Sequence, residues 1–121
     1  VIEKRRKRLY IPVWCGNEIH RIDLHSVAYV EARNHSLEIH LKAGNCLKTR
    51  MTLTELKELF QDVSGFMVVG ASYIVNLRCV QRVLPNTLEM TSGEAIPVPR
   101  RLRSEVKRQY FDFYMKEATG Q

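Results

Sequence analysis

Four histidines and three cysteines are the side chains of this sequence best suited to binding a metal ion or to nucleophilic chemistry. The histidines fall into two pairs, His20 with His25 and His35 with His40, and the members of each pair are five residues apart. On a strand, an odd separation places two side chains on opposite faces of the sheet. Because no pair has the spacing of zinc ligands, the sequence predicts no metal site and no cofactor.

The cysteines, Cys15, Cys46 and Cys79, are predicted to be structural. Their number is odd and no CxxC pair occurs, which argues against a disulfide framework and fits a reducing cytoplasm. None begins a predicted helix, where the pKa of a thiol would be lowered. We therefore expect each cysteine to be buried as a small apolar side chain.

The motifs of enzymes and of membrane proteins are absent from the sequence. No serine occupies a nucleophile elbow, and the six glycines are scattered rather than grouped in a phosphate-binding loop. No apolar run approaches the roughly 20 residues that span a bilayer, and no signal-peptide pattern is present. We expect a cytoplasmic protein that is not an enzyme and does not contact a membrane.

Basic side chains are the clearest chemical signal, and they are concentrated in two segments. The formal net charge is +6; residues 1–8 hold five basic residues against Glu3, and residues 100–108 hold five against Glu105. Such clusters suit a polyanionic partner, because each neutralised phosphate releases counterions. A solvated tail and a solvated helix face would have the same composition. Charge alone therefore leaves both interpretations open.

The segments that must position these groups are mostly short strands. The chain of 121 residues suits one domain. Apolar and polar residues alternate, as in residues 36–42, and turn signals recur at close intervals, which is typical of antiparallel β-structure. The predicted strands cover residues 9–14, 18–23, 25–32, 36–42, 46–51, 66–69, 73–77, 79–84, 88–90 and 94–98.

Two segments have helical periodicity instead. A short helix is predicted over about residues 53–62, since Thr52 and Glu55 form a capping box ahead of a leucine-rich stripe. A C-terminal helix is predicted over about residues 100–116. Its apolar stripe consists of Leu102, Val106, Tyr110 and Phe113. The fold class is therefore mainly β, with two helices.

Three polar or basic groups fall in predicted connections rather than in strand centres. They are Arg33-Asn34-His35, Gly70-Ala71-Ser72, and Arg100-Arg101 after Pro99. Loops on a rigid sheet often carry binding groups. Arginine can contact guanine with two hydrogen bonds in the major groove, and asparagine can do the same with adenine. A polar turn without a binding role would explain residues 33–35 equally well.

The sequence resembles the LytTR family of DNA-binding domains over roughly residues 9 to 109. The run FMVVGASYIVNLRCVQRV (66–83), followed by GEAIPVPRR (93–101), is similar to the central signature of the family. MTLTELKELF (51–60) is similar to its short helix, and YVEARNHSLEIHLKAG (29–44) to its preceding hairpin. The resemblance implies a LytTR-type domain over residues 9–121, after a basic linker or tail at residues 1–8.

Members of this family are mostly C-terminal output domains of bacterial response regulators in two-component systems. The resemblance implies an elongated stack of antiparallel β-sheets whose loops enter successive major grooves of bent DNA. It further implies double-stranded promoter DNA as the partner, a receiver domain upstream of Val1, and a possible dimer on repeated DNA sites. A protein-interaction or sensory module on the same scaffold, with weakened DNA binding, is the alternative.

The resemblance also places the family's three contact positions on this chain. They fall on His35, on Gly70-Ala71 and on Arg100. Gly70-Ala71 departs from the family, which commonly has His, Arg or Asn there, and Pro99 stands where the family usually has Ser. The expected base contacts are His35, Arg100 and Asn34, and the expected DNA-backbone contacts are Arg33, Gly70, Ala71, Ser72, Arg101, Arg103, Lys48 and Arg50. Tyr73 and Asn76 also match the family signature, but we predict structural roles for them.

Overall fold

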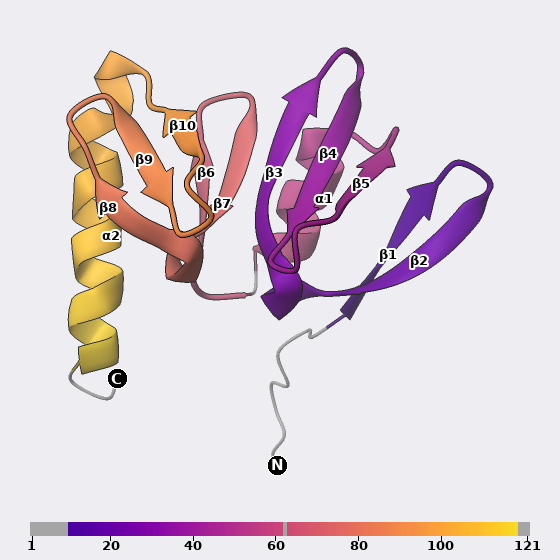
Figure 1. Ribbon diagram of the computed structural model, residues 1–121, viewed down its shortest axis with the longest axis horizontal. Coiled ribbons are helices and arrows are strands. Elements are labelled where there is room, and N and C mark those ends of the chain that lie inside the picture. The colour runs from indigo at the N-terminus through magenta and orange to yellow at the C-terminus, as the bar shows by residue number, and fades with distance from the viewer. Residues whose placement is uncertain (1–9, 62, 119–121) are drawn as a thin grey trace.

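Three antiparallel β-sheets stand side by side along the longest axis of the molecule (Figure 1). This computed structural model describes residues 10–61 and 63–118, so the predicted tail at residues 1–8 lies outside the described residues. A hairpin is formed by β1 (Tyr10–Cys15) and β2 (Glu18–Asp23). The central sheet has the order β5-β4-β3-β7-β6, with β3 (Val27–Arg33), β4 (Ser36–Leu41), β5 (Cys46–Thr49), β6 (Phe66–Val69) and β7 (Tyr73–Asn76). The third sheet has the order β10-β9-β8, with β8 (Val80–Val83), β9 (Thr87–Met90) and β10 (Ala95–Pro97).

One hydrophobic core lies between the central sheet, the β1–β2 hairpin and the helix α1 (Leu53–Phe60). The predicted capping box is present, with Glu55 N donating to Thr52 Oγ1 at 3.1 Å and Thr52 N donating to Glu55 Oε1 at 2.9 Å. Leu56 and Phe60 are buried against residues of β1, β3 and β4. The helix ends at Phe60, slightly before the predicted end at residue 62.

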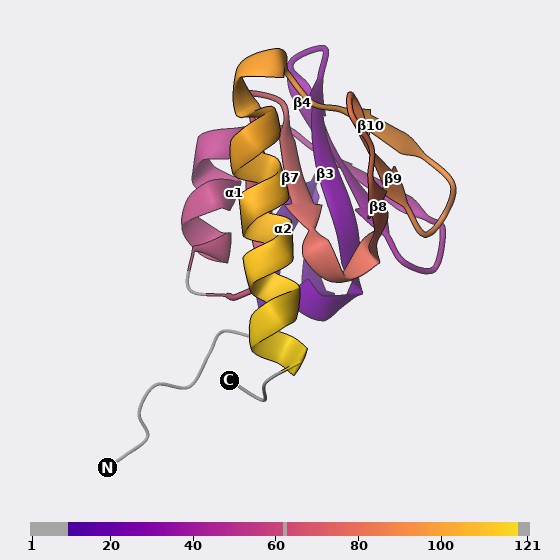
Figure 2. The ribbon, with the colours of Figure 1, turned by 90° about the vertical axis from the view of Figure 1, so that its left-hand side faces the viewer.

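A second core lies between β3, β6 and β7, the β8–β10 sheet, and the helix α2 (Arg103–Ala118). Figure 2 looks at this end of the molecule and shows α2 running along it. The predicted C-terminal helix begins at residue 100 with a turn of 3-10 helix, Arg100–Leu102. Val106 is buried, and Leu102, Tyr110 and Phe113 pack around it as the apolar stripe predicted.

Asn76 joins elements of the central sheet, as its predicted structural role requires. It is buried, its Nδ2 donates to Val27 O at 2.8 Å, and its Oδ1 accepts from Arg78 N at 3.0 Å. Tyr73 is half-buried, and its hydroxyl donates to Glu31 Oε2 at 3.3 Å. The contacts of both side chains are with other parts of the fold, as their predicted structural roles require.

Two predicted strands begin later than expected, because a side chain caps the turn before each of them. Asp23 accepts from His25 N at 2.9 Å, and Asn76 accepts from Arg78 N in the same way. Each contact holds a 3-10 turn, Leu24–Ser26 and Leu77–Cys79, in place of the first residues of the strand. In the described part of the chain, no helix is long and apolar enough to cross a membrane.

The prediction that all three cysteines are buried is confirmed for Cys79 only, and it fails most clearly for Cys46. Cys79 is buried and Cys15 is partly exposed, but Cys46 is exposed. It lies on β5, which is one of the two edge strands of the central sheet. An alternating strand pattern does not show which of its faces remains open to solvent.

Candidate nucleic-acid interface

Three connections predicted to carry binding groups lie along one edge of the molecule, the upper edge in Figure 1. They are the β3–β4 turn, the β6–β7 turn and the 3-10 turn ahead of α2. Ala32 N donates to Ser72 O at 2.8 Å, which joins the first two connections. The Gly70 backbone lies beside Pro99 and Leu102, because a Cβ placed on it would be 3.6 Å from Pro99 Cγ. The fold therefore brings residues 33–35, 70–72 and 100–102 into one row.

The β3–β4 turn presents two exposed polar side chains at its tip. Arg33 pairs with Ser36 across the two strands, so Asn34 and His35 form a two-residue turn. Both have positive φ angles, 50° and 65°, as the tight hairpin turn that fits the sheet twist requires. Asparagine and histidine tolerate this conformation better than most residues. The turn is thus rigid, and both side chains face solvent.

The β6–β7 turn is one residue longer than the β3–β4 turn and offers few polar side chains. Gly70 has a φ of +64°, a conformation that glycine adopts without strain. Ala71 and Ser72 are exposed, so the serine hydroxyl is the one polar side-chain group of the turn. This structure agrees with the prediction that the turn offers mainly backbone groups.

The turn ahead of α2 presents Arg100 and Arg101, which are both exposed. Neither forms an ion pair with any residue between 10 and 118 that the structure describes. Arg103 differs, because it is partly buried and its Nε donates to Val98 O at 3.4 Å. Arg108 is held by Glu105 and by Asp112, the latter at 3.1 Å. The basic side chains of residues 100–108 therefore differ in availability: Arg100, Arg101 and Lys107 are exposed, whereas Arg103 and Arg108 are held by protein oxygens.

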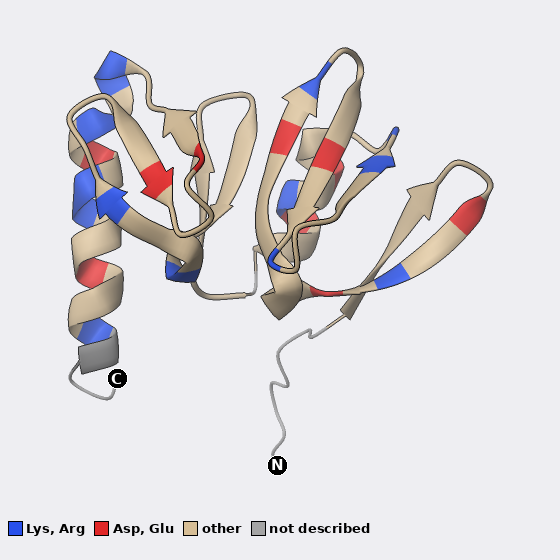
Figure 3. Cartoon of the chain, viewed as in Figure 1, with Lys and Arg blue, Asp and Glu red and all other residues tan. Residues whose placement is uncertain are grey.

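Lys48 and Arg50 extend the row on the other side of the β3–β4 turn. Leu37 pairs with Thr49, so Arg50 follows β5 alongside the start of β4. A shallow hollow is lined by residues of the β3–β4 turn and by Arg50. Figure 3 shows Lys and Arg along the upper edge and most Asp and Glu below it. Arg33 lies 3.3 Å from Glu31, and this carboxylate raises the pKa of the guanidinium. The ion pair also offsets part of the positive charge that Arg33 could present to a phosphate.

One exposed residue beside this row was missed by the sequence analysis. Trp14 is 54% exposed, and it lines a hollow together with Lys48 and Arg50. Its neighbour Val13 is fully buried, so the alternation of β1 already indicated an outward indole. An aromatic ring beside two cations adds apolar contact area at this end of the row.

The fold and this edge define a class of small β-proteins with loops aligned along one side, and comparisons identify the family. The sequence model of the LytTr DNA-binding domain family matches residues 17–110, and the chain belongs to this family. A solved structure described as the LytTr DNA-binding domain of a methyl-accepting/DNA response regulator from Bacillus cereus has the same fold. It aligns with a TM-score of 0.70 and 19% identity, over 84% of this chain and 96% of that one. No curated protein matches the sequence.

Family membership and the fold confirm the resemblance found in the sequence and the expected stack of antiparallel sheets. LytTR is a family of DNA-binding output domains of response regulators that act in transcription regulation. The contact residues expected from the resemblance remain predictions, and the structure brings most of them into one row.

Proposed function

We propose that this domain binds double-stranded promoter DNA at specific sequences, through major-groove contacts made by the row of three connections. The observation that carries the proposal is the alignment of residues 33–35, 70–72 and 100–102 along a single edge with basic side chains around it. Tight turns that project from one edge can enter a groove. The neighbouring cations attract phosphates on both sides of it.

Base contacts are assigned to the two ends of the row. His35 and Asn34 project from a fixed turn, and Arg100 is exposed and makes no ion pair within the described chain. The Arg100 guanidinium can donate to both N7 and O6 of guanine, while Asn34 can pair with adenine.

Phosphate contacts are assigned to the residues around these ends. Arg101, Lys48 and Arg50 are exposed, whereas Arg33 and Arg103 are partly held by protein oxygens and contribute less. The β6–β7 turn offers the Ser72 hydroxyl and the backbone amides of Gly70 and Ala71. These groups position the domain without reading sequence.

The biological setting follows from the family. We infer that residues 9–121 form the output domain of a bacterial response regulator in the cytoplasm and that residues 1–8 link it to an upstream receiver domain. Two copies would bind repeated half-sites on one promoter. An enzyme activity has no place in this proposal.

Selection of bound duplexes from a random pool tests the proposal. The domain is expected to enrich a short motif, repeated at about one helical turn if two copies bind. Competition with bulk DNA at fixed salt then gives the specificity ratio. Binding without enrichment would reduce the function to sequence-independent DNA binding. Absence of binding would favour the alternative, a protein-interaction or sensory module.

A further inference from the structure

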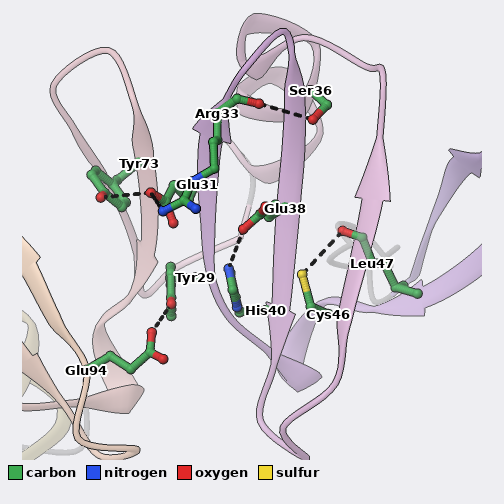
Figure 4. Close-up of polar contacts among 10 residues, drawn as sticks. All are labelled: Tyr29, Glu31, Arg33, Ser36, Glu38, His40, Cys46, Leu47, Tyr73 and Glu94. Carbon is green, nitrogen blue, oxygen red and sulfur yellow. Dashed lines mark hydrogen bonds and ion pairs between the residues drawn. The ribbon is translucent and has the colours of Figure 1, made fainter.

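A glutamate, a histidine and a cysteine come together on one face of the central sheet, beside the ring of Tyr29. His40 on β4 pairs directly with Cys46 on β5, and Glu38 lies two residues before His40 on the same face. The carboxylate oxygen, imidazole nitrogen and sulfur that they offer all lie within 4.8 Å of one another. Figure 4 shows these three side chains, with Glu38 and His40 on one strand and Cys46 beside them on the next.

The imidazole of His40 is held in place with a nitrogen left over. Its ring stacks on Tyr29, with 4.3 Å between the centroids and an angle of 11° between the planes. The Nε2 atom is buried and makes no hydrogen bond in the described structure; it lies 3.4 Å from Glu38 Oε1 without hydrogen-bond geometry. A buried polar atom that makes no hydrogen bond and has only this long contact is poorly satisfied. A ligand bound at Nε2 would satisfy it.

We propose that Glu38, His40 and Cys46 bind a divalent transition-metal ion of the zinc type. Imidazole nitrogen, thiolate sulfur and carboxylate oxygen are the three ligand types that Zn²⁺ accepts, and three protein ligands leave a fourth position for water. Metal–ligand bonds of about 2.0–2.3 Å need the three atoms somewhat closer than they are. Cys46 is exposed and the Glu38 side chain is partly exposed, so both can rotate inward.

Two carboxylates and two cations surround the site, since Arg33 pairs with Glu31 and Lys48 lies opposite Glu38. Glu31 pairs with Glu38 across β3 and β4, which places two carboxylates next to each other. Lys48 pairs with Glu38 from β5 and opposes a cation. Burial, followed by the charge of Glu38, raises the pKa of the Cys46 thiol. Metal binding must therefore displace the thiol proton, as it does in other cysteine sites.

The β1–β2 hairpin supplies an internal control, because it carries the same three residue types. Cys15 pairs with Glu18 across the hairpin, and His20 Nε2 lies 3.0 Å from Glu18 Oε1. Among the described residues, these three do not come together as a possible metal site, whereas Glu38, His40 and Cys46 do. The β1–β2 and β4–β5 hairpins therefore have the same three residue types, and they differ in how close the possible ligand atoms lie to one another.

Titration of the reduced, untagged domain with Co²⁺ tests the proposal, since thiolate ligation gives a charge-transfer band. The wild-type domain and Cys15→Ser are expected to bind one Co²⁺ with this band, and Zn²⁺ should displace it. Cys46→Ser should lose the band and bind Co²⁺ at least tenfold more weakly. Glu38→Gln should keep the band and bind more weakly.

Three results would overturn the site: no saturable band in the wild-type domain, a band that survives in Cys46→Ser, or a band lost in Cys15→Ser. Because Cys46 is exposed, its replacement by serine is not expected to affect folding. Thermal unfolding gives a second readout. Zn²⁺ should raise the Tm of the wild-type domain and of Cys15→Ser, but not that of Cys46→Ser.

Discussion

The β3–β4 turn and the β6–β7 turn are neighbours on one edge, and they differ in length and in chemistry. The first contains Asn34 and His35, which both bear exposed polar side chains at positive φ. The second contains Gly70, Ala71 and Ser72, of which Ser72 alone has a polar side chain. The comparison shows that neighbouring turns of one scaffold can offer different groups, side chains for base contacts in one turn and backbone amides for phosphate contacts in the other. The ends of the row carry side chains that can read bases, and the middle carries a backbone that can approach phosphates.

The largest expected effect comes from the scaffold that both turns share. Asn76→Ala removes two hydrogen bonds, a buried one to Val27 O and a partly buried one from Arg78 N. We expect the free energy of unfolding to fall by about 2–4 kcal/mol. Urea denaturation measures this loss. If stability is unchanged, Asn76 does not hold β7 to β3, and the two turns are aligned by other contacts.

Arg100→Ala should have the next largest effect, at the reading end of the row. We expect specific DNA binding to weaken by about 1–3 kcal/mol and the preference at one base position to relax. Arg108→Ala is the matched control, because Arg108 is nearby on α2 but is held by Glu105 and Asp112. Equal losses in the two variants, measured by titration of a selected duplex at fixed salt, would contradict a base contact by Arg100.

His35→Gly separates reading from folding in the β3–β4 turn. Glycine relieves the positive φ of 65°, so stability should stay within about 1 kcal/mol of the wild type. Loss of the imidazole should weaken specific binding by about 1–2 kcal/mol while leaving binding to bulk DNA unchanged. Paired thermal melts and competition titrations give both numbers. A variant that binds its selected duplex normally would remove His35 from the contacts.

Ala71→Arg should have the smallest effect on DNA affinity, and it should strengthen binding instead of weakening it. Ala71 is exposed in the turn that lacks reading side chains, so a cation placed there can reach a phosphate. We expect a few-fold tighter binding to all duplexes and a salt dependence steeper by about one unit. A gain for one sequence alone would show that this turn faces base edges. No gain at all would show that it does not face DNA.

The sequence predicted the parts of this fold that depend on local patterns. The capping box of α1 follows from two residue types at fixed spacing, and the apolar stripe around Val106 follows from helical periodicity. The tip residues Asn34 and His35 were found because a short polar break between alternating segments marks a turn. These features need no knowledge of which strands become neighbours.

The features that were missed depend on pairing between strands. Spacing along the chain separates Glu38 and His40 from Cys46, and only the register of β4 with β5 brings them together. The exposure of Cys46 depends on β5 being an edge strand. The contact of Arg33 with Glu31 and the hollow beside Trp14 likewise arise from the folded arrangement. A single sequence gives the order of strands but not their neighbours.

Methylation interference on the selected duplex tests the central claim most directly, because it distinguishes the two grooves. Methyl groups on guanine N7 lie in the major groove, and those on adenine N3 lie in the minor groove. We predict interference at guanine N7 in clusters about one helical turn apart, with the guanine contacted by Arg100 lost from each cluster in Arg100→Ala. Interference confined to adenine N3, or the same pattern in wild type and Arg100→Ala, would contradict major-groove reading by this edge.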